Sequence, residues 1–244
     1  MGLLSLSNKL SLNRLNSINT LPDSGCSDDS LELWLQHGDY DPPSMSLPTS
    51  IERWKDSSQH VRHYTQTESD HQPEWDGKVF DFDGDDDHLI QNTGSAIICT
   101  DEFTIGFTIA CDTADYANII SIADSTTNAD FIRINNSEVI QVKAAGEMHN
   151  ITLDQALPDG VPCAIVVQRV ASHECTIYID GTAQADTVEF SPSKPMDIDT
   201  IGCRNSELND FVGGIGEVIV YSCGEEATRK SVIDRLEYVK AQMR

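Results

Sequence analysis

Basic residues are scarce in this chain: 16 Lys and Arg stand against 40 Asp and Glu, which gives a formal net charge of −24. A surface of this charge repels the phosphates of nucleic acids and the headgroups of anionic membranes, so neither is expected as a partner. No run approaches the roughly 20 apolar residues of a membrane-spanning helix. Ser and Asn interrupt the N-terminal leucines, so no secretory signal is expected either.

Cysteine pairs are also missing from the sequence. The seven cysteines include no CxxC motif, and an odd number cannot all be paired. Cys99, Cys111, Cys163 and Cys175 lie in strand-like runs, where a free thiol packs as a small apolar group. The sequence therefore predicts reduced thiols and folding in a reducing cytoplasm.

Signatures of catalysis and of cofactor binding are equally scarce. Asp197 and Asp199 alternate along a strand but lack the glutamate partner of a sandwich glycosidase, Glu-x-Asp-x-x-Glu. The acidic run 81–87 lacks EF-hand spacing, which favours a solvated turn over a calcium site. His60 and His63 have no cysteine and no second histidine pair nearby, which favours ordinary surface histidines over a metal site. We therefore expect no enzyme activity, no catalytic residue, no metal ligand and no cofactor.

Short strand-like runs fill most of the sequence. Residues 78–90, KVFDFDGDDDHLI, predict two short strands joined by a tight acidic turn at Gly84, with Phe82 buried. Later runs follow at a spacing of about ten residues, which is typical of a sandwich. Asp180-Gly181 is the strongest hairpin signal. Residues 225–243 predict the one helix, with an apolar face made of Val232, Ile233, Leu236, Val239 and Met243.

Residues 1–22 differ from the rest of the chain, because they contain Lys9 and Arg14 and no acidic residue. Alternating leucines favour an extended segment in the first half, while a helix competes in the second half. One interpretation is a loose or self-packed terminus, and the other is an arm that binds a partner through its aliphatic side chains. In the second case the contact residues are Leu3, Leu4, Leu6, Leu10, Leu12, Leu15 and Ile18. The predicted organisation is an arm and linker over residues 1–30 and one domain over residues 31–244.

Five motifs follow one another along the chain. They are Leu33-Trp34-Leu35, Trp54-Lys55-Asp56-Ser57-Ser58, Phe82-Asp83-Gly84-Asp85-Asp86-Asp87, Tyr178-Ile179-Asp180-Gly181 and Gly214-Ile215-Gly216-Glu217-Val218-Ile219. In this order they resemble the concanavalin A-like (laminin-G-like) domains of phage and bacterial surface proteins, over about residues 31–243. The resemblance implies an all-β fold, a two-sheet jelly-roll β-sandwich with an extended N-terminal arm and one C-terminal helix.

The resemblance also suggests a function once the arm and the acidity are considered with it. It implies a non-enzymatic structural or decoration protein of a phage virion (a capsid accessory or a fibre), assembled in the host cytoplasm. The arm would bind a capsid or other virion protein, and the lectin-like sandwich would contact host-surface glycans. The alternatives are a free carbohydrate-binding lectin module and, with less support, a glycoside hydrolase.

Overall fold

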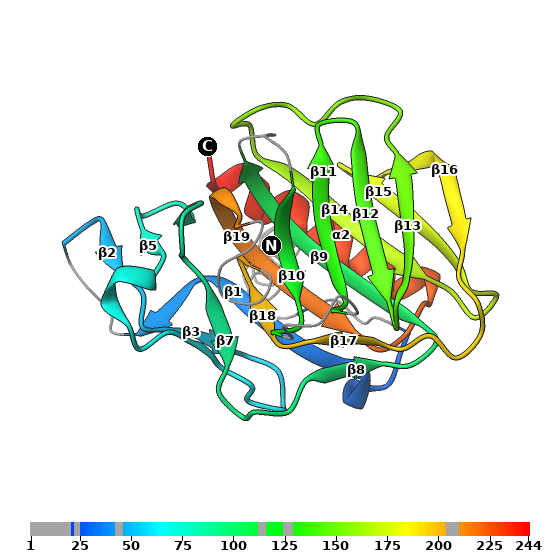
Figure 1. Cartoon of the computed structure of the whole chain (residues 1–244), viewed down its shortest axis with the longest axis horizontal. Helices are drawn as coiled ribbons and strands as arrows, with labels where there is room; N and C mark the ends of the chain where they lie inside the picture. Colours follow the sequence, from blue (N-terminus) through cyan, green and yellow to red (C-terminus); the bar gives the residue numbers. More distant parts are fainter. Residues whose placement is uncertain (1–20, 22–24, 42–45, 112–115, 124–128, 204–209) are drawn as a thin grey trace, which may run out of the picture.

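The computed structural model describes residues 21, 25–41, 46–111, 116–123, 129–203 and 210–244. Within them two antiparallel sheets pack face to face, with a helix behind one of them (Figure 1). The back sheet has the order β4 (Tyr64–Thr65), β3 (Arg53–Asp56), β1 (Leu31–Asp41), β19 (Val212–Tyr221), β9 (Phe103–Cys111), β14 (Cys163–Arg169), β15 (Glu174–Ile179) and β16 (Thr182–Glu189). The front sheet has the order β7 (Leu89–Gln91), β18 (Thr200–Ile201), β10 (Ala117–Ser121), β11 (Phe131–Asn136), β12 (Val139–Ala144) and β13 (Glu147–Thr152).

Short elements complete the described part of the chain. These are the strands β2 (Thr49–Ser50), β5 (Glu74–Trp75) and β6 (Phe80–Asp83), the pair β8 (Ile97–Cys99) and β17 (Met196–Ile198), the 3-10 turns η1 (Asp28–Ser30) and η2 (Ser69–His71), and the helix α2 (Glu226–Gln242). The predicted all-β jelly-roll sandwich with one C-terminal helix is confirmed. The predicted arm, residues 1–22, lies outside the described residues except for Leu21.

The two sheets are joined differently at their two edges. At one edge β4 pairs with both β3 and β7, so the backbone runs on from sheet to sheet. At the other edge carboxylates bridge β13 and β16: Asp186 accepts the N–H of Thr152 at 2.7 Å, and Glu147 accepts the N–H of Ser191 at 3.1 Å. Acidic side chains on edge strands also discourage pairing with a second chain.

The acidic stretch 78–90 contains the two predicted strands, but they do not form a hairpin. β6 pairs with β5 and β19, whereas β7 pairs with β4 and β18. The acidic connection therefore carries the chain from one sheet to the other. The prediction of paired strands was wrong because local residue types define a strand but do not choose its partner. The Asp180-Gly181 hairpin is confirmed: it joins β15 to β16, and both residues have positive φ, 49° and 75°, as a type I′ turn requires.

Two apolar layers hold the fold together. The main core lies between the sheets and includes Phe82, of which 1% is exposed. A smaller cluster lies between the back sheet and α2 and contains Trp34, Val166, Ile219, Val232 and Leu236. Trp34 is also buried, at 6% exposed, but it packs under the helix rather than between the sheets. A Cβ on residue 106 would lie 2.5 Å from Val232, so only glycine lets α2 approach β9 this closely.

Candidate functional site

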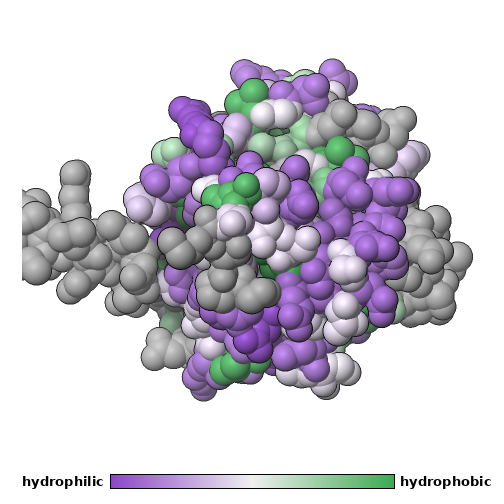
Figure 2. Space-filling model, turned by 90° about the vertical axis from the view of Figure 1, so that its left-hand side faces the viewer, coloured by the Kyte–Doolittle hydropathy of each residue, from purple (hydrophilic) through white to green (hydrophobic). Residues whose placement is uncertain are grey.

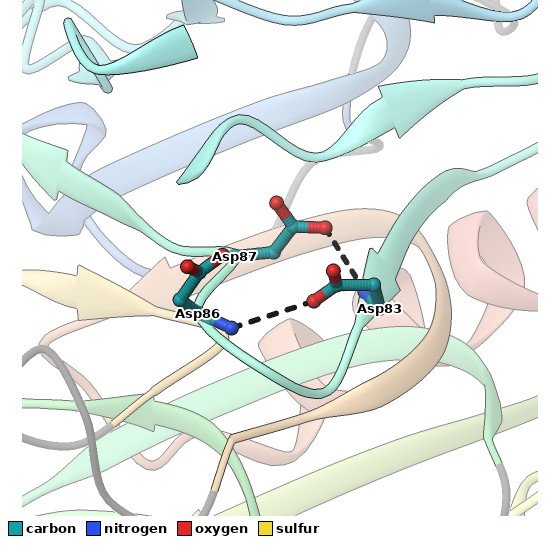
Figure 3. A group of neighbouring side chains, drawn as sticks. All are labelled: Asp83, Asp86 and Asp87. Atoms are coloured by element: carbon teal, nitrogen blue, oxygen red, sulfur yellow. Dashed lines mark hydrogen bonds between the residues drawn. The ribbon is translucent and has the colours of Figure 1, made fainter. Parts of the chain in front are cut away.

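The acidic connection between β6 and β7 gathers carboxylates from residues close in sequence. Candidate ligand atoms of Asp83, Asp86 and Asp87 all lie within 4.8 Å of one another (Figure 3). Asp83 accepts the N–H of Asp85 at 2.9 Å, and Asp87 accepts the N–H of Asp83 at 2.9 Å. The carboxylates thus hold their own turn in place.

This connection also concentrates negative charge. Burial, together with the smaller effect of the neighbouring charges of Asp83 and Asp86, raises the pKa of Asp87 to about 6. Burial likewise raises the pKa of Asp210 to about 6. A concavity of about 320 Å³ opens beside the cluster, lined by acidic and polar residues of β2, β5 and β6. Figure 2 shows this side of the molecule as mostly hydrophilic, with only small, separate apolar patches.

A different kind of surface covers the outer face of the front sheet. Ile132, Ile140 and Val142 belong to the core, so the alternate residues of β11 and β12 point away from it. The pairing register places Arg133 of β11 opposite Gln141 of β12, which in turn stands opposite Asn150 of β13. Arg133 Nε donates to Gln141 Oε1 at 2.6 Å, and Gln141 Nε2 donates to Asn150 Oδ1 at 2.7 Å. The result is a row of fixed polar groups across three strands.

Two aromatic rings adjoin this row. The guanidinium carbon of Arg133 lies 4.7 Å from the ring centroid of Tyr116 and 4.4 Å from that of Phe131. Tyr116 is 44% exposed, and its φ of 65° is uncommon for a residue other than glycine. We call Tyr116, Phe131, Arg133, Gln141 and Asn150 the front-face patch. It combines an exposed ring with groups that donate and accept hydrogen bonds, and the sequence analysis did not single it out.

The tryptophan–aspartate–serine motif serves the scaffold. The Asp56 carboxylate accepts the backbone N–H groups of Trp34, Ser58 and Arg62 at 2.7–2.9 Å. His63 Nδ1 accepts the N–H of Asp56 at 3.0 Å, so this imidazole also holds the loop. The motif fixes the bend after β3, as expected of a scaffold motif.

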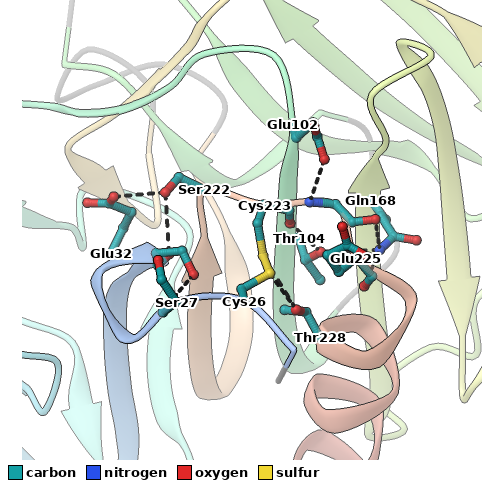
Figure 4. Close-up of a disulfide and its surroundings, with 12 residues drawn as sticks. Cys26, Ser27, Glu32, Glu102, Thr104, Gln168, Ser222, Cys223, Glu225 and Thr228 are labelled. Carbon is teal, nitrogen blue, oxygen red and sulfur yellow. Dashed lines mark hydrogen bonds between the residues drawn. A yellow bond between two sulfur atoms is a disulfide. The ribbon is translucent and has the colours of Figure 1, made fainter. Parts of the chain in front are cut away.

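The prediction of reduced cysteines is correct for five residues and wrong for two. Cys26 and Cys223 form a disulfide, while Cys99, Cys111, Cys163, Cys175 and Cys203 are buried free thiols. Figure 4 shows the bond joining the chain before β1 to the segment between β19 and α2, close to Thr228. The prediction failed because these two cysteines lie outside the strand-like runs and are 197 positions apart. Burial raises the pKa of Cys99 and of Cys175 to about 12.

The predicted partner-binding residues Leu3, Leu4, Leu6, Leu10, Leu12, Leu15 and Ile18 all lie outside the described residues. The next aliphatic residue, Leu21, is described, and it packs partly buried against the cluster under α2. Gly25 then passes the first turn of that helix, where a Cβ would lie 3.0 Å from Ala227. The root of the arm is therefore on the helix side of the sandwich. In the described part of the chain, no helix has the length and apolar character needed to cross a membrane.

Known proteins share this architecture. A Trypanosoma rangeli sialidase in complex with 2,3-difluorosialic acid matches 98% of this chain and 39% of its own, with a TM-score of 0.57 and 14% identity. A structure described as the HCR/D W1238A mutant matches 88% of this chain and 52% of its own, with a TM-score of 0.59 and 12% identity. The chain thus spans less than half the length of the sialidase.

At these identities the structural likeness shows the fold. No curated protein sequence matches the chain. The family model of the concanavalin A-like lectin/glucanases superfamily matches residues 83–227, which is more than half of the chain. With this match and a jelly-roll sandwich to support it, the chain belongs to the concanavalin A-like lectin/glucanases superfamily.

Proposed function

We propose that this chain is a non-catalytic carbohydrate-binding module and that its binding surface is the front-face patch. Sugars present apolar ring faces beside hydroxyl groups that both donate and accept hydrogen bonds. The exposed ring of Tyr116 offers a surface for stacking, and the exposed amide of Asn150, held in place by the buried Gln141, offers a donor and an acceptor on the same face. The observation that carries the proposal is this pairing of an exposed aromatic ring with a fixed polar row on one face.

The chemistry of the same face favours binding over hydrolysis. Among the described residues of β11, β12 and β13, the side chains that alternate with the core positions include amides, two cations and a thioether, and none is a carboxylate. Glycoside hydrolysis requires two carboxyl groups about 5–10 Å apart across the scissile bond. Asp199, one of the two acids considered from the sequence, accepts the Ala123 N–H at 2.6 Å and the Thr200 hydroxyl at 2.7 Å. These bonds suit a structural role for that carboxylate.

A glycan array followed by calorimetry with the strongest oligosaccharide tests the proposal. Tyr116→Ala should weaken binding by about tenfold or more, because losing a stacked ring removes roughly 1.5 kcal/mol or more. Tyr238→Ala is the matched control, since Tyr238 is 42% exposed on α2, behind the back sheet. It should leave the affinity unchanged. An array without any bound glycan, or equal affinity of Tyr116→Ala and the wild type, would refute the proposed site.

We further propose that the module is displayed on a phage particle, where its N-terminal arm binds a capsid or other virion protein. Leu21, near the end of the arm, packs beside α2 behind the back sheet, whereas the front-face patch lies on the outer side of the front sheet. An arm anchored in the particle would therefore leave the patch turned toward solvent and toward host-surface glycans. The net charge of −24 keeps neighbouring copies apart.

Deleting residues 1–22 tests this placement. The truncated protein keeps Cys26 and the described body from Gly25 onward and loses only the packing of Leu21, so it should unfold close to the wild-type temperature and bind glycans as before. It should no longer sediment with purified particles. Full-length Tyr116→Ala is the complementary control, which should load onto particles but bind glycans about tenfold or more weakly than the wild type. Full loading of the truncated protein would exclude the arm as the anchor.

A further inference from the structure

The Cys26–Cys223 disulfide lies on the wall of a cavity of about 480 Å³. Cys26 precedes β1, Cys223 follows β19, and both residues are partly exposed. Figure 4 shows the bond between the chain before β1 and the start of α2. A cavity of this volume holds a small molecule, so a small reagent has access to the two sulfur atoms.

The other five cysteines are closed to such a reagent. Each is at most 2% exposed in the folded protein. Burial also raises the pKa of Cys99, Cys163 and Cys175, so these groups stay in the unreactive thiol form. Exchange between thiols and disulfides needs access to a sulfur atom and a thiolate as the attacking group. In the folded protein, exchange is therefore confined to the Cys26–Cys223 bond.

The two sulfur atoms of the bond have different surroundings. Cys223 lies just before α2, which begins at Glu226 and is 17 residues long. The positive end of a helix dipole stabilises a thiolate placed beside it. The hydroxyl of Thr228, in the first turn of the same helix, donates to Cys26 Sγ at 2.8 Å and lies 3.4 Å from Cys223 Sγ. Cys223 is therefore the better leaving group, and an incoming thiolate should attack Cys26.

The cavity beside the bond is negatively charged. Among the described residues that line it, Asp101, Glu102 and Glu225 are acidic and none is basic. Glu102 comes close to the bond, because its carboxylate accepts the N–H of Gly224, the residue after Cys223, at 3.2 Å. At low ionic strength these carboxylates repel an anionic thiol and attract a cationic one. The cavity thus discriminates between thiols by their charge.

We propose that the Cys26–Cys223 bond is an exchange site for small thiols without negative charge, which open it and untie the chain before β1 from the start of α2. The incoming thiolate bonds to Cys26 Sγ, the bond between the two cysteine sulfurs breaks, and its electron pair leaves on Cys223 Sγ. Cys223 then takes up a proton from solvent. A second thiol attacks the incoming sulfur, so Cys26 is released as a thiol and the two small thiols leave as a disulfide. Two electrons pass from the small thiols to the cysteine pair.

Exchange rates of the folded full chain with two thiols of opposite charge test the site. Cysteamine is the cationic thiol and 2-mercaptoethanesulfonate the anionic one, and each rate is divided by that thiol's rate with the neutral 2-hydroxyethyl disulfide. At low salt the normalised rate should be about tenfold higher for cysteamine, and the difference should shrink in concentrated sodium chloride, which screens the carboxylates. Mass spectrometry of the first mixed disulfide should find cysteamine on Cys26.

Two single substitutions separate the charge of the cavity from the charge of the whole protein. Glu102→Gln removes one charge beside the bond, keeps an oxygen for the Gly224 N–H, and should lower the preference for cysteamine about threefold. Glu138→Gln is the matched control, because the exposed Glu138 lies between β11 and β12 of the front sheet, and it should leave the preference unchanged. Equal normalised rates for the two thiols, a bond that neither thiol opens in the folded protein, or cysteamine on Cys223 would overturn the proposal.

Discussion

Replacing Cys26 and Cys223 together with serine should lower the free energy of unfolding by about 4 kcal/mol. The two residues are 197 positions apart, so their bond closes a loop that contains most of the domain. A cross-link of this span removes a large part of the conformational freedom of the unfolded chain, and the loss on reduction grows with loop length. Denaturant titration followed by tryptophan fluorescence measures the difference.

Reduction of the wild-type protein is the matched control for this substitution. Dithiothreitol should destabilise the wild type by the same amount and leave the double serine variant unchanged. In unfolded but unreduced protein, thiol titration should find the five free cysteines, and all seven after reduction. Seven thiols before reduction would show that the pair is not bonded in solution. Equal stability of variant and wild type would contradict the loop-closure argument.

The disulfide also bears on the compartment in which the protein is assembled. Assembly in a reducing cytoplasm was expected partly because all cysteines were predicted to be thiols. Disulfides persist mainly in oxidising compartments, so the Cys26–Cys223 bond weakens that argument. The five buried thiols are compatible with either compartment. Burial raises the pKa of Cys99, Cys163 and Cys175, which keeps these three thiols protonated and unreactive.

Much of the fold was predictable because strands, turns and the helix have local signatures. The positive φ values at Asp180 and Gly181 follow from residue types that tolerate them, and the apolar period of residues 225–243 defines α2. Strand pairing was less predictable. β6 and β7 are neighbours in sequence but belong to different sheets, because each strand pairs where its apolar face completes the core.

The candidate binding surface could not be found from the sequence for a related reason. Arg133, Gln141 and Asn150 are separate polar positions in three strands, and alternation shows only that each faces away from the core. That they form one row depends on the register of β11, β12 and β13. The contact of Tyr116 with Arg133 depends on how the chain enters β10.

The second large expected effect is a loss of stability when the partner of Glu217, the glutamate of the β19 motif, is replaced. Glu217 is fully buried and binds Arg235 of α2 through both carboxylate oxygens, at 2.6 and 2.7 Å. It also accepts the indole N–H of Trp34 at 2.7 Å. The pair is the polar link within the apolar layer between helix and back sheet. Arg235→Met should therefore cost about 3–5 kcal/mol in denaturant titrations, because it leaves the Glu217 carboxylate buried without its cation.

A double variant separates the cost of the unpaired Glu217 charge from the cost of the lost Arg235 packing. In the double variant Glu217→Gln with Arg235→Met, the charge is removed while an amide oxygen remains for the indole N–H of Trp34. We expect it to be less destabilised than Arg235→Met alone, by about 2 kcal/mol, because a buried pair contributes less than the penalty of breaking it. Lys230→Met is the exposed control. Its ion pair with Glu226 lies at the surface of α2, where water screens the two charges, so the free energy of unfolding should stay close to the wild-type value. A double variant less stable than Arg235→Met would mean that the contacts of the guanidinium group, rather than the unpaired charge, account for the loss.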